Sequence, residues 1–305
     1  MGTPAFAVPS LEALASAATV VGVVSQPNKP RGRGLTAAAT PIARAAAALD
    51  LPLIQPPTLR GSEAQDAIAQ WKPDLLVVAA YGKLLPDALL ALPTLAPINV
   101  HASLLPRHRG AAPIQAAIVA GDSDTGVTIM RITAELDAGD MLLRRSVAIA
   151  DDDTGATLTA RLAALGGTAL TEAIVTLRRD GLEPAPQDPA IATYAPRLER
   201  EHGRIDWTEA ADTIARKVRA FTPWPSTFTA LGKRTVKVVH ARADLGANPE
   251  DAPGTIVGID ETAVRVATGT GTLALTTLQL EGKKALPAPV FARGARLAAG
   301  TRFDG

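Results

Sequence analysis

The alternation of short apolar runs with alanine-rich stretches is the feature of this 305-residue sequence that most restricts its fold. Up to about residue 180, runs rich in Val, Leu and Ile occur at 20–24, 75–80, 98–100 and 127–132. Strands that alternate with helices are typical of a parallel sheet covered by helices. We therefore expect a doubly wound, mostly parallel α/β domain over residues 1–183.

A long helix is expected to close this domain, from about residue 154 to 179. Apolar residues recur there at helical spacing, namely Leu158, Leu162, Leu165, Leu170, Ile174 and Leu177. The preceding Asp-Asp-Asp-Thr run at 151–154 is explained by an N-cap with acids at the positive end of the helix dipole. We therefore do not expect a metal site there.

The pattern of residue types changes after residue 183. Prolines at 184, 186, 189 and 196 indicate a linker over 184–203. One helix is expected near 208–221, and alternating runs predict strands at 226–230, 234–241, 254–259, 263–268 and 272–280. Short strands with turn signals between them favour a small β-barrel like the oligonucleotide-binding (OB) fold over 204–305.

Composition and charge narrow the function. The sequence has no cysteine, so thiolate nucleophiles and disulfides are excluded, and we expect a cytoplasmic protein. No apolar run approaches the roughly 18 residues of a membrane span. Residues 203–305 contain 14 Lys and Arg against 10 Asp and Glu, a net charge of +4, whereas residues 1–202 have a net charge of −3. This asymmetry is compatible with a nucleic-acid or other polyanionic partner, although a mixed-charge surface is the commoner explanation.

The stretch Ile-Asn-Val-His at 98–101 places two polar side chains on one face of a predicted strand. Alternation buries Ile98 and Val100 and turns Asn99 and His101 together to the other face. In open α/β sheets, ligands bind outside the carboxyl ends of the strands, which is where this pair is expected. A hydrogen-bonded pair with no catalytic role remains the alternative.

A second loop supplies a carboxylate. The stretch GVTIMRITAELDAGDML, residues 126–142, predicts a strand that runs into a glycine-containing loop with Asp137 and Asp140. A carboxylate beside an imidazole fixes its tautomer and favours its protonated form. Spacing does not choose between the two aspartates.

Such a trio suits acyl transfer without a covalent enzyme intermediate. An amide supplies donors, an imidazole exchanges protons near neutral pH, and a carboxylate receives one. Since there is no cysteine and no Gly-x-Ser-x-Gly elbow, the attacking group is expected to belong to the substrate, with the oxyanion facing Asn99 and His101.

The stretch INVHASLLPRHRGAAPIQAAIVAGDSDTGVTIMRITAELDAGDML, residues 98–142, resembles the active-site region of folate-dependent formyltransferases. The segments GTPAFAV, QPNKPRGRG, VVAAYGKLLP, RIDWTEAA, AFTPWP and EGKKAL are similar to the branch of that family that acts on methionyl-tRNA. The resemblance covers nearly the whole chain. It implies a Rossmann-like formyltransferase domain followed by an OB-like domain that binds tRNA.

The resemblance also implies roles for individual residues. Asn99, His101 and Asp137 match the catalytic trio, so Asp137 is chosen over Asp140 on the family motif. The co-substrate implied is 10-formyltetrahydrofolate, and the residues expected to line its site are Ser103, Leu104, Leu105, Pro106, Tyr81 and Gly82. The amino group of initiator methionyl-tRNA would attack the formyl carbon. We expect a monomer that needs no metal.

Basic residues in two regions are expected to contact tRNA. The loop at 26–34 contains Lys29, Arg31 and Arg33 without an acidic residue, and by resemblance it enters the acceptor stem. A solvated basic loop is the alternative, and Gly32-Arg33-Gly34 lacks the strand-turn-helix context of a dinucleotide fingerprint. In the C-terminal domain the expected contacts are Lys233, Arg234, Lys237, Lys283 and Lys284.

Three other functions use parts of the same pattern. An N-formyltransferase acting on an amino sugar nucleotide would use the same trio. A hydrolase of formyltetrahydrofolate would need no acceptor. A non-catalytic RNA-binding protein would need only the basic barrel, and the presence of Asn99, His101 and Asp137 argues against it.

The start of the sequence departs from the family pattern. The chain begins Met1-Gly2-Thr3-Pro4, whereas the family places a short apolar strand directly before Gly-Thr-Pro. The doubly wound fold also needs a first strand at this point. We expect a gap there, from either a misplaced start site or an absent strand.

Overall fold

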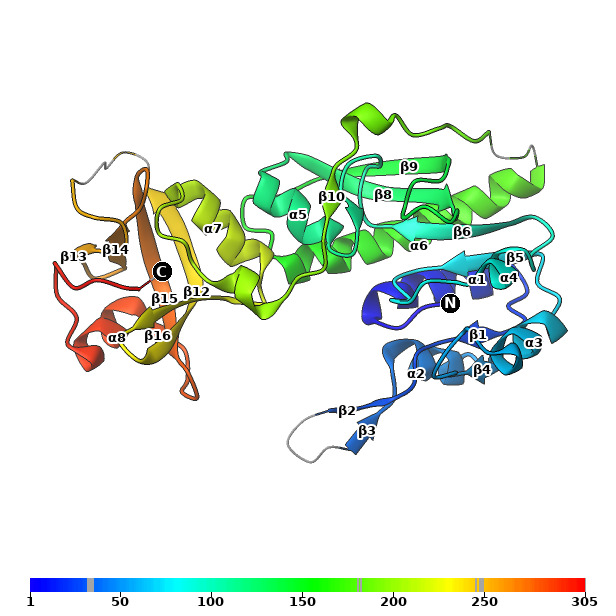
Figure 1. Ribbon diagram of the computed structural model, residues 1–305, viewed down its shortest axis with the longest axis horizontal. Helices are drawn as coiled ribbons and strands as arrows, with labels where there is room; N and C mark the ends of the chain where they lie inside the picture. Colours follow the sequence, from blue (N-terminus) through cyan, green and yellow to red (C-terminus); the bar gives the residue numbers. More distant parts are fainter. Residues whose placement is uncertain (32–35, 180, 182, 245, 247–249, 305) are drawn as a thin grey trace. The chain divides into compact units, whose positions relative to one another are not determined.

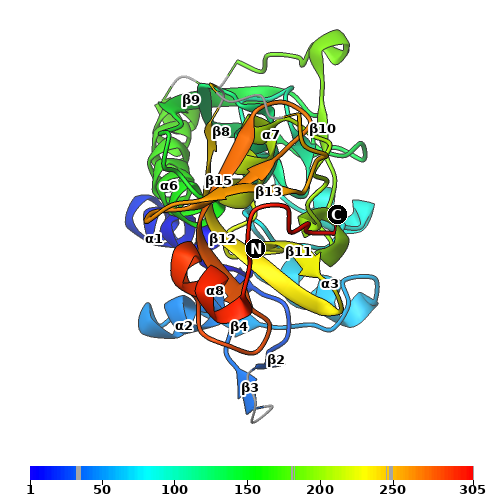
Figure 2. The same ribbon diagram turned by 90° about the vertical axis from the view of Figure 1, so that its left-hand side faces the viewer.

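The chain forms an α/β unit and a β-rich unit in the computed structural model, which describes residues 1–31, 36–179, 181, 183–244, 246 and 250–304 (Figures 1 and 2). The α/β unit comprises residues 1–113, 124–148 and 159–196. The β-rich unit comprises residues 197–305 together with two earlier segments, 114–123 and 149–158. The predicted fold class is confirmed. The domain boundaries expected near 183 and 203 remain a prediction.

Six of the strands in the α/β unit form two groups. In the first, two strands pair in parallel, β1 (Val23–Val24) and β4 (Leu53–Ile54). In the second, the order is β5-β6-β8-β9, with β5 and β6 parallel and the two later pairs antiparallel. These four strands are β5 (Leu75–Val78), β6 (Ala96–His101), β8 (Asp124–Arg131) and β9 (Met141–Ala148). Apolar periodicity is the same for both strand directions, so the sequence did not reveal the antiparallel half.

Helices connect these strands. A 3-10 turn, η1 (Ala5–Ala7), leads into the first helix. The helices are α1 (Val8–Ala17), α2 (Pro41–Ala48), α3 (Ser62–Gln70), α4 (Asp87–Leu90), α5 (Pro113–Ala120) and α6 (Gly155–Arg179). The helix predicted over 154–179 is thus confirmed as α6. The Thr154 hydroxyl accepts a hydrogen bond from the Thr157 backbone N–H at 3.2 Å, which confirms the predicted N-cap.

Two adjacent glycines let α6 lie close to its neighbours. A Cβ atom at Gly166 would be 3.0 Å from Val100 Cγ1 on β6, and one at Gly167 would be 2.9 Å from the Pro9 carbonyl oxygen on α1. The apolar face of β6 is therefore covered by α6. This helix is also long and apolar enough to cross a bilayer by length and composition alone, and half of its most apolar 18-residue window is buried inside the protein.

The first two residues occupy a gap between β1 and β5. The Met1 amino group donates to the Val77 carbonyl oxygen at 2.6 Å, and the Ala79 N–H donates to the Met1 carbonyl oxygen at 2.9 Å. On the other side, the Gly2 N–H donates to the Val24 carbonyl oxygen at 3.0 Å. Residues 1 and 2 thus take the place of a strand between β1 and β5, as the doubly wound fold requires.

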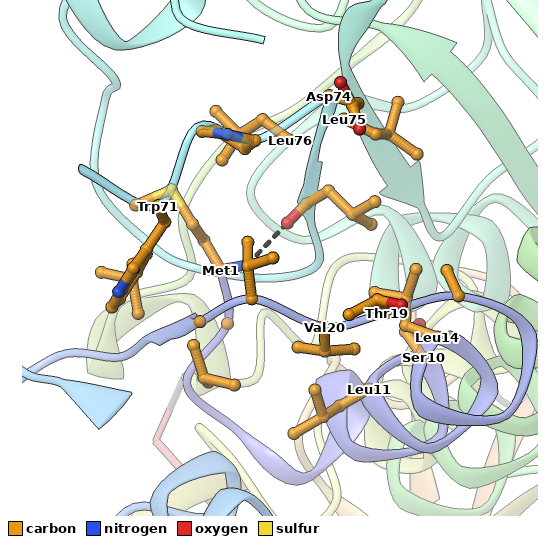
Figure 3. Close-up of a pocket in the computed structure, with 18 of the residues that line it drawn as sticks. Met1, Ser10, Leu11, Leu14, Thr19, Val20, Trp71, Asp74, Leu75 and Leu76 are labelled. Carbon is orange, nitrogen blue, oxygen red and sulfur yellow. Dashed lines mark hydrogen bonds between the residues drawn. The ribbon is translucent and has the colours of Figure 1, made fainter. Parts of the chain in front are cut away.

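A cavity of about 360 Å³ lies next to these two residues (Figure 3). Residues 20–24 and 75–77 line it along the two flanking strands, and Leu11, Leu14 and Trp71 line it from the helices. Burial lowers the pKa of the Met1 amino group to about 5. Residues 1 and 2 therefore fill only part of the space between β1 and β5.

The basic loop predicted at 26–34 is partly a hairpin. Strand β2 (Lys29–Arg31) pairs antiparallel with β3 (Thr36–Ala38), so the prediction of an irregular segment is wrong at these residues. The hairpin extends away from the body of the α/β unit (Figure 1). Prolines are tolerated in edge strands such as these. Arg33, which was expected to contact tRNA, lies outside the described residues.

The segment expected to be a linker adds short elements. They are η2 (Pro189–Ile191), β10 (Tyr194–Ala195) and η3 (Arg200–Gly203). Strand β10 pairs in parallel with β7 (Arg109–Gly110), so this part of the segment belongs to the α/β unit and is held by its loops.

The β-rich unit is an antiparallel sheet with the order β11-β12-β15-β14-β13. Its elements are α7 (Ala211–Ala220), β11 (Thr227–Leu231), β12 (Arg234–Asp244), β13 (Ile256–Ile259), β14 (Val264–Ala267), β15 (Thr272–Leu280), β16 (Leu286–Pro287) and α8 (Ala288–Ala295). Each of the five predicted strands is confirmed within a few residues. The helix expected at 208–221 is confirmed as α7.

The C-terminal tail joins the two edges of this sheet. The Asp304 N–H donates to the Ala230 carbonyl oxygen on β11 at 2.9 Å, and the Ile256 N–H on β13 donates to the Thr301 carbonyl oxygen at 2.8 Å. Behind these contacts, Trp207 stacks on Phe303 with ring centroids 5.9 Å apart. The sheet therefore curves around one apolar core.

Candidate functional site

Strand β6 presents Asn99 and His101 on one face, as predicted. The alternate residues Ile98 and Val100 are buried in the core, whereas Asn99 is half-buried and His101 is 5% exposed. The pair lies at the carboxyl end of β6, beside Val78 of β5 and Thr128 of β8.

Asp137, on the loop between β8 and β9, reaches both side chains. Its Oδ1 atom is 3.5 Å from Asn99 Nδ2, and its Oδ2 atom is 3.6 Å from His101 Nδ1. The Gly110 N–H donates to Oδ2 at 2.8 Å. The structure thus brings together the three residues that the sequence singled out.

The rival carboxylate, Asp140, has a different role in this loop. Its backbone carbonyl oxygen accepts a hydrogen bond from the Arg131 N–H at 2.9 Å, which closes the end of the β8–β9 hairpin. Asp137 has a φ of 49°, in the left-handed region. This conformation is unusual for a residue other than glycine, and tertiary contacts must hold it.

The two nitrogen atoms of His101 face different partners. Nε2 is 3.0 Å from the His108 carbonyl oxygen, so Nε2 carries a proton and donates it. Burial lowers the pKa of His101, although Asp137 acts in the opposite direction. The expectation that Asp137 favours the protonated form is correct in sign, but burial outweighs it. In the neutral ring, Nδ1 is then an acceptor facing Asp137.

The loop at 103–106 follows β6 directly and is held by Thr128. The Thr128 hydroxyl donates to the Ser103 carbonyl oxygen at 2.7 Å and accepts from the Leu105 N–H at 3.2 Å. Leu105 packs in a core cluster with Met130 and Met141. Leu104 is half-buried, whereas the side chains of Ser103 and Pro106 are buried.

Tyr81 and Gly82 lie just after β5. Tyr81 packs its ring among apolar core residues, and its hydroxyl has no hydrogen-bond partner among the described residues. Its carbonyl oxygen accepts from Gln26 Nε2 at 2.7 Å. Gly82 has a φ of 80°, which favours glycine. No hydrogen bond or ion pair in the described part of the chain joins these two residues to the trio.

Several groups at the site were missed by sequence reasoning. Two are backbone atoms, the Gly110 N–H and the His108 carbonyl oxygen, and no side-chain pattern signals such groups. The others are Thr128 and Gln187, whose amide donates to the Asp137 carbonyl oxygen at 2.8 Å. Thr128 alternates with buried apolar residues on β8, which could have marked it as an inward polar residue.

The basic residues expected in the C-terminal domain lie at one end of its sheet. Strand register pairs Val236 with Leu280, and the Glu281 N–H donates to the Thr235 carbonyl oxygen at 3.1 Å. The turns before β12 and after β15 are therefore neighbours. All five of the expected basic residues are exposed, namely Lys233, Arg234, Lys237, Lys283 and Lys284. In the hairpin Lys29 is exposed.

No group of three or more His, Cys, Asp or Glu side chains is arranged to hold a metal ion among the residues that the structure describes. The trio itself contains only one carboxylate and one imidazole. The expectation that the protein needs no metal stays a prediction.

Comparison with known families matches both units. The family described as Formyl transferase matches residues 2–174, and Formyl transferase, C-terminal domain matches residues 197–296. Among solved structures, the N-formyltransferase from Helicobacter canadensis, solved with folinic acid and dTDP-3-aminofucose, superposes with a TM-score of 0.64. It covers 90% of this chain and 97% of its own, at 18% identity, and therefore supports the fold alone.

Curated relatives give a more specific result. A methionyl-tRNA formyltransferase from Myxococcus xanthus is 45% identical over 302 residues, which cover 99% of this chain and 96% of that protein. One from Marinobacter nauticus is 46% identical over 285 residues, covering 93% of this chain and 91% of that protein. On this similarity, the chain belongs to the methionyl-tRNA formyltransferase family.

Proposed function

We propose that this enzyme transfers the formyl group of 10-formyltetrahydrofolate to the amino group of the methionine carried by initiator tRNA. The observation that carries this proposal is the convergence of Asn99, His101 and Asp137 at the end of β6. The relatives that match almost the whole chain are named for this activity.

The trio is proposed to stabilise negative charge on the formyl oxygen. Bound 10-formyltetrahydrofolate supplies the formyl group, and attack by the methionyl amine places charge on its oxygen. One Asn99 N–H points to Asp137, which leaves the second N–H of the same amide as a donor to that oxygen. Hydrogen-bond donors that are already in position lower the activation free energy of formyl transfer, because they need not reorient as the charge develops.

His101 is proposed to act through its Nδ1 edge. Its Nε2 atom is engaged by the His108 carbonyl oxygen, whereas Nδ1 lies across a 3.6 Å gap from Asp137. A proton received at Nδ1 would make this edge a donor toward the oxyanion. Because burial keeps the ring neutral at rest, it is ready to accept such a proton.

Asp137 is proposed to receive the proton that the attacking amine releases, directly or through water. In the complete reaction, the amine nitrogen forms a bond to the formyl carbon, and the bond from that carbon to the folate nitrogen breaks. The folate nitrogen gains the proton that the amine loses. Asp137 is suited to hold this proton in passage because it is held in place by Gly110 and lies beside Nδ1.

The folate is proposed to bind beside the loop at 103–106 and near Tyr81 and Gly82. The backbone of this loop is fixed by Thr128, so it offers a preformed edge to a planar ring. The Tyr81 hydroxyl is a buried polar group that a ligand can satisfy. Both features are compatible with a planar, polar pterin ring.

Initiator tRNA is proposed to contact the hairpin and the basic end of the β-rich sheet. The candidate residues in the 26–34 segment are Lys29, Arg31 and Arg33, and those of the sheet are Lys233, Arg234, Lys237, Lys283 and Lys284. Such residues bind the phosphate backbone and leave specificity to other groups. We further propose that the enzyme acts as a monomer in the cytoplasm.

Mass spectrometry of the reaction products tests the function. The enzyme is mixed with 10-formyltetrahydrofolate and charged initiator tRNA, and in parallel reactions with a dTDP-amino sugar or without any acceptor. We expect formylmethionyl-tRNA in the first reaction only. Formylation of the sugar alone would favour the sugar enzyme, and release of formate without acceptor would favour the hydrolase.

A further inference from the structure

Residues 185–195, which we call the strap, run alongside the two loops that hold the trio. At one end, Ala185 and Met141 exchange two backbone hydrogen bonds of 2.8 Å. At the other end, the Arg109 N–H donates to the Thr193 carbonyl oxygen at 2.8 Å, where β10 pairs with β7. A proline-rich segment that the sequence presents as a linker is therefore tied to both loops at the site.

Gln187 is the strap residue that reaches the Asp137 loop. Its Nε2 atom donates to the carbonyl oxygens of Asp137 and Gly139, each at 2.8 Å. Its Oε1 atom accepts from Arg109 Nε at 3.0 Å. Both hydrogens and the oxygen of one amide are thus used in a single set of contacts.

The partner of Gln187, Arg109, is itself buried and held by the Asp137 loop. Its side chain is only 4% exposed and lies 3.7 Å from Glu135, which stands just before Asp137 in the same loop. The next residue, Gly110, donates its N–H to Asp137 Oδ2. Both parts of Asp137 are therefore held by residues of β7. Arg109 holds the Asp137 backbone through Gln187, and the Gly110 N–H holds the Asp137 carboxylate directly.

The strap also supports His101 through one intermediate residue. The Thr193 hydroxyl accepts from the His108 N–H at 2.8 Å, and the His108 carbonyl oxygen contacts His101 Nε2 at 3.0 Å. His108 has a φ of 59°, in the left-handed region like Asp137. Such backbone conformations persist only where surrounding contacts impose them.

From these contacts we propose that Gln187 is a positioning residue, which holds the Asp137 loop in the conformation that brings its carboxylate beside His101. Gln187 acts through Asp137 and contacts no reacting atom. The inference rests on the proposed function, because it assigns Asp137 a part in formyl transfer. A displacement of about 1 Å in such a group lowers a rate by up to about a hundredfold.

Two substitutions remove the two N–H donors of the Gln187 side chain in different ways. Gln187→Met keeps the shape of the side chain but removes all three hydrogen bonds. Gln187→Glu keeps the acceptor for Arg109 but sets a carboxylate oxygen against two carbonyl oxygens. Ala190→Glu, at an exposed strap position, is the charge-matched control. All variants are made in the full chain and checked for an unchanged melting transition of the bulk fold.

The first readout is hydrogen exchange, which does not depend on activity. In both Gln187 variants, amides of residues 137–141 should exchange at least about tenfold faster than in the parent, while the β-rich unit is unchanged. Ala190→Glu should match the parent. Unchanged protection in Gln187→Met would overturn the proposal, whether or not the protein formylates tRNA.

The second readout is the single-turnover rate with saturating folate and methionyl-tRNA. We expect Gln187→Met and Gln187→Glu to lower it by about tenfold to a hundredfold, with little change in folate affinity. On an Asp137→Asn background, the same substitutions should have at most about a threefold further effect, because they act through Asp137. If the rate losses of the Gln187 substitution and of Asp137→Asn simply multiply in the double variant, the proposal is overturned. Inactivity of the parent would instead count against the proposed function and would leave the exchange result as the test.

Discussion

His101 turns its Nδ1 atom toward Asp137 Oδ2 across a gap of 3.6 Å, while its Nε2 atom lies 3.0 Å from the His108 carbonyl oxygen. A neutral ring that donates from Nε2 has no proton at Nδ1. The gap therefore separates two acceptors, which attract one another only when a proton is placed between them. A resting site that lacks this proton is able to accept one during the reaction.

Asn99→Ala should lower the rate of formyl transfer by about a hundredfold or more, because it removes one preorganised donor. Single-turnover kinetics with folate binding followed by fluorescence measure this effect, and folate affinity should change little. Gln70→Ala, on the exposed side of α3, serves as the control. His101→Ala should have at least as large an effect, and the double variant should fall short of the product of the two. Near-parent rates in Asn99→Ala would show that the amide is structural.

Asp137→Asn should depress turnover while the loop keeps its shape. The asparagine oxygen can still accept from Gly110, but the charge that favours a protonated His101 is lost. The rate of the chemical step, measured in a single turnover, should fall at every pH between 6 and 9. Asp140→Asn should leave the rate close to that of the parent, since Asp140 contributes its backbone to the hairpin. An equal loss in both variants would contradict this assignment.

Stability should rise with pH from about 5 to 8 because of the Met1 amino group. Its pKa is lowered by burial from 8.0 to about 5, so between these values the unfolded chain binds more protons than the folded chain. The full effect is about 4 kcal/mol by linkage, an upper bound. His101 acts in the same direction below its ordinary pKa of 6.5. Chemical denaturation across this range measures the total.

Variants separate the two contributions to this pH dependence. An N-terminally acetylated chain should lose most of the dependence between pH 7.5 and 8, where His101 is almost fully neutral in both states. His101→Gln should retain that part and lose some of the dependence below pH 6.5. A curve that is flat from pH 5 to 8 in the parent would show that the amino group is not buried in solution.

Extending the chain upstream of Met1 by four residues such as Val and Ile should stabilise the α/β unit. These residues would continue the strand begun by Met1 and Gly2 and fill the cavity between β1 and β5. A strand that is central in the sheet buries apolar surface on both faces. The melting temperature should rise by several degrees, whereas a Gly-Ser extension of equal length should give little gain. Equal melting temperatures for the two extensions would show that the cavity does not accept a strand.

Arg33→Ala should impair the use of methionyl-tRNA far more than it changes folate binding. Replacing Lys283 and Lys284 together by alanine should weaken tRNA binding and flatten its salt dependence, by about 0.7 to 0.9 in log–log slope for each phosphate that the protein no longer neutralises. Arg60→Ala, which removes one exposed cation, is the charge-matched control for Arg33→Ala. Binding titrations between 50 and 200 mM salt measure these effects, and a slope equal to that of the parent would remove these residues from the tRNA interface.

The strands and long helices were predictable because their apolar residues repeat with a clear period. The pairing of Asn99 and His101 followed from the same alternation on β6, and the choice of Asp137 over Asp140 came from the family motif. The strand directions beyond β6 and the hairpin at β2 were not predictable, because periodicity carries no direction and the prolines obscure an edge strand.

The remaining part of the site depends on contacts between residues far apart in the sequence. Gln187 reaches Asp137 across 50 positions, and Thr128 reaches Ser103 across 25. Neither has a local signal, since a glutamine in a proline-rich segment and a threonine in a strand are ordinary. The lowered pKa of His101 is likewise set by burial, which only the tertiary structure determines.

The grouping of residues 114–123 and 149–158 with the β-rich unit has a consequence for the order of folding during synthesis. Arg216 of α7 donates to the Val119 carbonyl oxygen, and the Ala156 N–H donates to the Thr222 carbonyl oxygen, so both early segments find partners in residues made later. Domains that emerge first from the ribosome usually fold first. Until α7 has been translated, these two segments therefore lack the partners that Arg216 and Thr222 give them in the folded chain.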